Sequence, residues 1–129
     1  MTTLKVGIAD YDEMKARTMR IAKGEEKPAP GDPKVWFTSM ESFAQLLSSG
    51  NRELLRVIDE QSPGSLEELS RITGRSKPSL SRTLKTMANY GLVRMDPGEG
   101  QKVVPKVLHD RVALELPLIE RRAAKGSAL

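Results

Sequence analysis

The segment 71–95 reads RITGRSKPSLSRTLKTMANYGLVRM and holds six basic residues but no Asp or Glu. The order of its residues predicts the end of one helix, a glycine turn, a second helix, a glycine stop and the start of a strand. An ordinary exposed face mixes charges of both signs. A stretch that is exclusively basic therefore indicates a surface for an anionic partner.

The second helix of this segment is predicted to span about residues 77–90. Ser76 or Lys77 caps its start, and Pro78 lies in its first turn, where a missing amide hydrogen costs little. Gly91 follows the last helical residue, as is common at helix ends. The predicted buried stripe has residues spaced four and three apart, namely Leu80, Leu84 and Met87.

The opposite face of this helix suits the major groove of DNA. Arg82 lies at its centre, where a guanidinium can pair with the two acceptors of guanine, and Lys85 is its nearest helper. The start of the helix suits a phosphate because the positive end of the helix dipole lies there. The predicted DNA-binding residues are Arg75, Ser76, Lys77, Pro78, Ser79, Arg82, Lys85, Thr86, Asn89, Arg94 and Lys102.

A hairpin is predicted to follow the basic helix. Residues 92–95 form its first strand, 96–100 its turn and 102–107 its return strand, with Pro97 and Gly98 as the central pair of a type II turn. The tip carries Asp96 and Glu99, which would repel a phosphate. The basic helix is therefore expected to carry specificity, and the hairpin only to assist.

Three shorter helices are predicted before the basic helix. The first, capped by Thr38 or Ser39, covers about 39–48 and ends at the SSGN stretch, and the second covers 52–60. The third begins with a capping box, in which the Ser65 hydroxyl and the Glu68 carboxylate satisfy each other's backbone donors. It runs to about Ile72 and is predicted to bury Leu66, Leu69 and Ile72. The order of elements over 35–110 predicts a winged helix-turn-helix DNA-binding domain.

The flanking segments complete an α+β, mainly α, protein. Residues 1–23 are predicted as a strand-helix arm, in which Leu4, Val6 and Ile8 alternate and Asp10 caps the helix. The mildly apolar stripe of this helix is predicted to contain Tyr11, Met14, Thr18, Ile21 and Ala22. Residues 24–34 hold three prolines and two glycines and are predicted as a linker. Residues 111–129 are predicted to contain a strand, because apolar residues alternate over 112–118, or else a helix, followed by a frayed polar tail.

Composition narrows the classes of function. The chain has 129 residues, no cysteine and one histidine, His109, so it lacks the residues for disulfides, thiolate catalysis, zinc fingers and His-based triads. We expect no catalytic, metal or cofactor-binding residues. A net charge of +4 favours an anionic partner only mildly. No apolar run reaches the length of a membrane helix and no signal peptide is recognised, so a cytoplasmic protein is expected.

The segment 74–95 resembles the MarR-type and ArsR-type winged-helix regulators. In that pattern a small polar cap precedes serines, an arginine and a leucine, and Gly-Leu-Val opens the wing. The matching residues here are Ser76, Ser79, Ser81, Arg82, Leu84 and Gly91-Leu92-Val93. The resemblance implies a winged-helix fold that binds double-stranded DNA.

A narrower resemblance covers most of the chain. The N-terminal strand-helix, Phe37, Ser39 and the stretch 51–55 (NRELL) are similar to small prokaryotic regulators and TumA-like antitoxins, including antitoxins paired with TumE-type toxins. Such antitoxins bind their own promoter and hold a toxin through the segment outside the DNA-binding domain. The resemblance implies that the arm binds a toxin, and the alternative is a dimerisation or core-covering arm.

The leading hypothesis is therefore a sequence-specific, homodimeric transcriptional regulator, either alone or as an antitoxin that regulates its own promoter. The alternative is an antitoxin or protein-interaction module whose main role is to neutralise a cognate toxin. RNA binding is a third hypothesis, although Tyr90 is the only aromatic residue in the basic segment. An enzyme is least expected, because no nucleophile, metal set or phosphate loop can be assembled.

Overall fold

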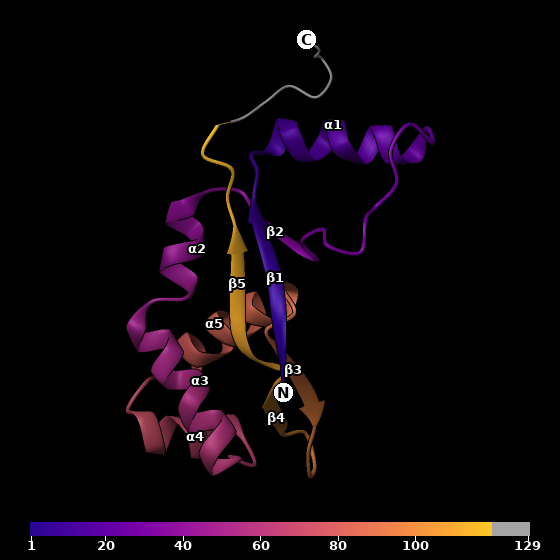
Figure 1. Ribbon diagram of the computed structural model, residues 1–129. Coiled ribbons are helices and arrows are strands. Elements are labelled where there is room, and N and C mark those ends of the chain that lie inside the picture. Colours follow the sequence, from indigo (N-terminus) through magenta and orange to yellow (C-terminus); the bar gives the residue numbers. More distant parts are fainter. Residues whose placement is uncertain (120–129) are drawn as a thin grey trace.

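The computed structural model describes residues 1–119, which form a mixed α+β protein (Figure 1). The predicted tail at 120–129 lies outside the described residues. The helices and strands follow in the order β1 (Thr2–Ile8), α1 (Tyr11–Ala22), β2 (Val35–Phe37), α2 (Met40–Leu46), α3 (Ser49–Gln61), α4 (Leu66–Thr73), α5 (Lys77–Asn89), β3 (Val93–Pro97), β4 (Val103–Val107) and β5 (His109–Glu115).

A three-stranded parallel sheet joins the two ends of the described chain. Its order is β2-β1-β5, so β1 is central and pairs with β2 on one side and β5 on the other. Figure 1 shows β1 and β5 side by side although most of the chain separates them. Of the two alternatives for the C-terminal segment, a strand or a helix, the structure shows the strand.

Helix α1 crosses over between the parallel strands β1 and β2. The predicted Asp10 cap is confirmed, and Glu13 completes a capping box with it. No residue of α1 is buried, and its half-buried side includes Arg17 instead of the predicted Thr18. Arg17 forms ion pairs with Glu26 and Asp32, at 3.3 and 2.8 Å. The segment predicted as a linker thus folds back onto α1.

One hydrophobic cluster connects this sheet with the helices. It contains Leu4 and Val6 of β1, Phe37 of β2, and buried residues of α2 to α5 and β3. Phe37 stacks on Tyr90 at a centroid distance of 4.0 Å and meets the edge of Phe43 at 5.2 Å. The predicted arm 1–23 and the predicted domain 35–110 therefore share one core.

Helix α3 starts three residues earlier than predicted. The stretch 48–51 was interpreted as a break, but Ser48 is a helix cap whose hydroxyl accepts a hydrogen bond from the Asn51 amide at 3.2 Å. The prediction was wrong because serine and glycine favour both turns and helix starts. Of the two residues predicted to cap helix α2, Thr38 and Ser39, the structure shows Ser39.

Two details of α4 also differ from the prediction. The Ser65 hydroxyl caps the helix as expected, at 3.1 Å from the Glu68 amide. The Glu68 carboxylate, however, accepts from the amide of Gly64 and not from that of Ser65. Ile72 was predicted to be buried, but it lies at the last turn of the helix and is 37% exposed.

The hairpin β3–β4 is longer than predicted, since Pro97 still pairs with Val103. The amide of Gly98 donates to the Lys102 carbonyl, and the tight turn begins at Glu99. Gly100 has φ +63°, whereas Gly98 does not have a positive φ. A type II turn centred on Pro97 and Gly98 was therefore wrong, because such a turn needs a positive φ at its second central residue.

Candidate nucleic-acid interface

Helix α5 is fixed to the core along one side. The predicted stripe of Leu80, Leu84 and Met87 is confirmed, and each of these side chains is 0% exposed. Ser76 caps the start, with its hydroxyl 3.2 Å from the Ser79 amide. Gly91, with φ +79°, follows the C-terminal end as predicted. The outward side of α5 is therefore held in one orientation.

The outward side of α5 is exposed and carries no acidic residue. Arg82, Lys85, Thr86 and Asn89 are all exposed. Within residues 1–119, neither Arg82 nor Lys85 takes part in an ion pair. The Thr86 hydroxyl donates to the Arg82 carbonyl at 3.1 Å, so its proton is already used inside the helix. The long side chains of Arg82 and Lys85 remain available to a partner.

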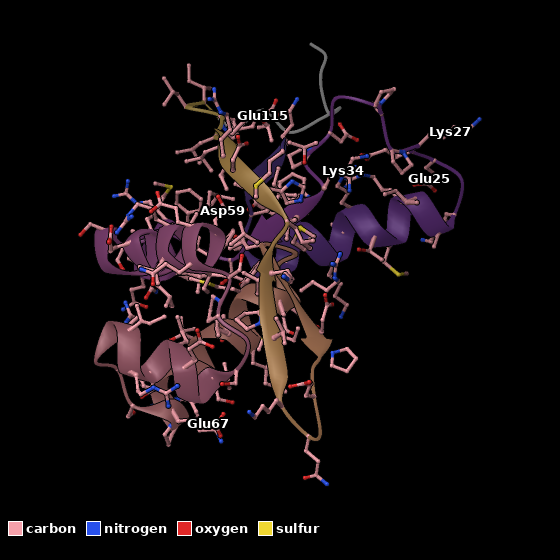
Figure 2. The ribbon with its side chains drawn as sticks, turned by 90° about the horizontal axis from the view of Figure 1, so that it is seen from below. Glu25, Lys27, Lys34, Asp59, Glu67 and Glu115 are labelled. Atoms are coloured by element: carbon pink, nitrogen blue, oxygen red, sulfur yellow. The ribbon has the colours of Figure 1, made fainter. Side chains whose placement is uncertain are left out.

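Lys77, at the start of α5, is paired with a carboxylate from the neighbouring helix. Its ammonium group contacts the carboxylate of Glu67 on α4, which Figure 2 labels. The hydrogen bond from Lys77 holds the pKa of Glu67 below its ordinary value. Lys77 must exchange this ion pair for any phosphate contact, which reduces what it can contribute to binding.

In the hairpin, too, a predicted basic contact residue is paired with a carboxylate. Arg94 on β3 donates to Asp96 through Nε at 2.6 Å and through Nη2 at 3.1 Å. These hydrogen bonds lower the pKa of Asp96 and raise that of Arg94. Lys102 is exposed just before β4. Among the predicted hairpin contacts, Lys102 is thus better placed than Arg94 to meet a phosphate.

Arg75, in the turn between α4 and α5, is tied to the protein itself. Its Nη1 donates to the Asn51 side-chain oxygen and its Nη2 to the Gly50 carbonyl, both at 2.9 Å. The side-chain Nδ2 of Asn51 in turn donates to the Leu46 carbonyl at the end of α2, at 3.0 Å. Sequence reasoning did not find Asn51 as this partner, because the two residues are far apart in the chain. Arg75 therefore positions α5 against α2 and α3.

Arg75→Ala is expected to lower the free energy of unfolding by about 1–2 kcal/mol, because it removes two hydrogen bonds from a charged, partly exposed donor. Urea unfolding of the free protein measures the change. Arg71→Ala is the matched control, since Arg71 is exposed and lies one helical turn earlier. Unchanged stability of Arg75→Ala would contradict the positioning role.

The start of α5 offers fewer amides to an anion than the sequence led us to expect. Pro78 has no amide hydrogen, and the Ser79 amide already donates to the Ser76 hydroxyl. These residues are close together at the exposed corner between α4 and α5, as predicted. Their contribution to phosphate binding is therefore expected to be small, and the middle of α5 carries most of the available charge.

A family model described as HVO_A0114 matches residues 46–114, more than half of the chain. The chain belongs to the HVO_A0114 family. No match was found among curated proteins. The HVO_A0114 match runs from the end of α2 to the end of β5. It thus covers all eleven predicted contact residues, whereas β1, α1 and β2 lie outside it.

Metal sites and membrane-spanning helices were both expected to be absent from this HVO_A0114 protein. Within residues 1–119, no group of three or more His, Asp or Glu side chains is arranged to hold a metal ion. None of the helices in that part of the chain is both long and apolar enough to cross a membrane. His109 starts β5, and its Nδ1 lies 2.7 Å from the Thr2 hydroxyl oxygen.

Proposed function

We propose that this chain is a cytoplasmic, homodimeric transcriptional regulator that binds double-stranded DNA through a winged helix-turn-helix. Helices α4 and α5 and the turn at Gly74 are the helix-turn-helix, and β3–β4 is the wing. The observation that carries the proposal is the outward side of α5, where Arg82 and Lys85 are exposed, free of ion pairs within residues 1–119, and opposite a fully buried stripe.

The proposed roles follow from the charges left available. Arg82 reads base edges in the major groove, with Lys85 and Asn89 beside it. Lys102 contacts the backbone next to the groove. Lys77 and Arg94 already have carboxylate partners, so their contacts with DNA phosphates contribute little to binding. The proposal thus assigns sequence preference to α5 and a general affinity for phosphate to the rest.

Arg82→Ala is expected to reduce the preference for the cognate duplex over random DNA by about 1–3 kcal/mol, because a bidentate base contact is lost. The cognate duplex is first sought in the DNA upstream of the protein's own gene. Fluorescence anisotropy with two labelled duplexes, repeated across a salt series, measures both affinities.

Lys77→Ala is the matched control, and we expect it to weaken binding to both duplexes slightly and equally, since Glu67 already compensates this charge. Equal losses on both duplexes for Arg82→Ala would remove Arg82 from base reading. Affinity for DNA that is absent, or that does not fall with rising salt, would refute the DNA-binding function itself.

A second candidate function is suggested by α1, which buries no residue and exposes Tyr11 and Met19, 70% and 49% respectively. Such exposed apolar side chains on a helix suit a protein partner, and the resemblance to antitoxins makes a cognate toxin the candidate. Co-expression with the product of the neighbouring gene, followed by co-purification, tests this. A growth defect that the chain does not relieve would exclude neutralisation.

RNA binding receives no support from the aromatic side chains. Single-stranded RNA is held mainly by bases stacked on exposed aromatic rings. Tyr90, the aromatic residue of the basic segment, is half-buried and has one face covered by the parallel ring of Phe37. We therefore retain duplex DNA as the nucleic acid of the proposal.

A further inference from the structure

Strand β5 forms an open edge of the parallel sheet. It hydrogen bonds β1 on one side and ends the strand order β2-β1-β5 on the other. The strand is seven residues long, whereas the opposite edge strand, β2, has three. A long edge presents a row of unpaired amide and carbonyl groups that favours the addition of another strand.

An apolar groove adjoins this edge. A cavity of about 820 Å³ lies between α2, α3 and β5, and its apolar lining includes Phe43, Leu47, Leu55 and Val112. Val112 and Leu114 pair with the buried residues Leu4 and Val6 of β1, so all four face the helices. Leu114 nevertheless remains 37% exposed. The sheet covers the helices on this side only as far as β5, and the helices extend beyond that strand.

The charges of β5 are complementary to a second copy of β5 that runs antiparallel. When the two strands are aligned about Ala113, Arg111 lies opposite the partner's Glu115, and Glu115 lies opposite the partner's Arg111. Val112 then lies opposite the partner's Leu114 on the other face. Arg111 and Glu115 are both exposed, and neither takes part in an ion pair within residues 1–119.

We propose that two copies of this chain dimerise by pairing their β5 strands antiparallel about Ala113, which joins two three-stranded sheets into one. In this dimer the β5 strand of one copy covers the groove of the other copy, and Val112 and Leu114 of that strand lie over the groove. The groove matters because a strand edge alone buries less surface than a stable interface needs, which is about 1,200–2,000 Å² in total.

This dimer supplies the homodimer of the proposed function, and its surface is separate from the α5 surface. The groove beside β5 is lined by no residue of α4 or α5, and Figure 2 shows Glu115 of β5 and Glu67 of α4 on opposite sides of the view. Two copies joined through β5 can therefore both keep α4 and α5 uncovered. The dimer can be tested without DNA, so its failure and the failure of DNA binding are distinguishable.

The test uses charge reversal and analytical ultracentrifugation over a concentration series. Arg111→Glu and Glu115→Arg each replace two attractive pairs by two repulsive pairs, and each is expected to weaken the dimer about tenfold. The double variant R111E/E115R should recover wild-type affinity. An equimolar mixture of the two single variants should also recover it, because the mixed dimer restores both pairs. Arg82→Ala is the control and should dimerise like the wild type.

Other outcomes would overturn the proposal. The proposal is excluded if the wild-type chain stays monomeric at about 100 µM, because a concentration on the order of a weak dimer's Kd would populate the dimer. A dimer that resists both single reversals uses another surface. Weakening by both single variants without recovery in the mixture would show that β5 pairs in a different register or receives a different protein. Urea unfolding of each variant confirms that the monomer remains folded.

Discussion

Phe37→Ala is expected to lower the free energy of unfolding by about 3–5 kcal/mol, the range typical of removing a large buried aromatic ring. Phe37 is 1% exposed and ends β2, while its two aromatic neighbours belong to α2 and the end of α5. Its removal leaves a cavity where the parallel sheet meets the helices. The loss of stability is large because this ring contacts both the parallel sheet and the helices.

Urea unfolding, followed by circular dichroism, measures the effect of Phe37→Ala. Tyr11→Ala is the matched control, since it also removes an aromatic ring but at a position that is 70% exposed, and a change within about 0.5 kcal/mol is expected. A loss below about 1 kcal/mol for Phe37→Ala would contradict the shared core, because exposed or loosely packed rings are the ones that can be removed at so small a cost.

Leu84→Ala is expected to cost about 2–5 kcal/mol, because Leu84 is 0% exposed at the centre of the stripe that fixes α5. The variant keeps Arg82 and Lys85 but loosens the helix that presents them. We therefore expect weaker binding to the cognate duplex as well, since an ordered recognition surface is required for a fixed set of base contacts.

Lys85→Ala is the neighbouring control for Leu84→Ala and should leave the free energy of unfolding within about 0.5 kcal/mol, because Lys85 is exposed. Unfolding curves of both variants test the prediction. Equal stability of Leu84→Ala and the wild type would show that α5 is not anchored through this stripe, and the orientation assigned to Arg82 would then lose its basis.

Local signals predicted α5 well. Ser76, Pro78 and Gly91 mark its ends, and the spacing of Leu80, Leu84 and Met87 identifies its buried side, because these features depend only on residues close in the chain. Asp10 and Ser65 were identified as caps for the same reason, and Ser39 was one of two candidates for the cap of α2. The residues predicted on the outward side of α5 are indeed exposed, whereas their contacts with DNA stay predictions.

Long-range partners could not be predicted in the same way. The alternation in residues 112–118 suggested a strand, but not that it pairs with β1 in parallel, and the choice between strand and helix stayed open. Arg75 was predicted to meet a phosphate, whereas the structure ties it to Asn51 and Gly50. The ion pair of Lys77 with Glu67 was missed likewise, since it joins two helices across the turn.

The parallel pairing of β1 with β5 sets a condition on how the chain folds during synthesis. Thr2 of β1 pairs with His109 of β5. Strand β1 is synthesised first, so it gains its second neighbouring strand only after β5 has been made. Contacts between residues so far apart in the sequence form late, and they lower the folding rate. Helices α2 to α5 and the hairpin rely instead on local contacts. On the ribosome, Leu4 and Val6 therefore depend on β2 and the helices for cover until β5 has emerged.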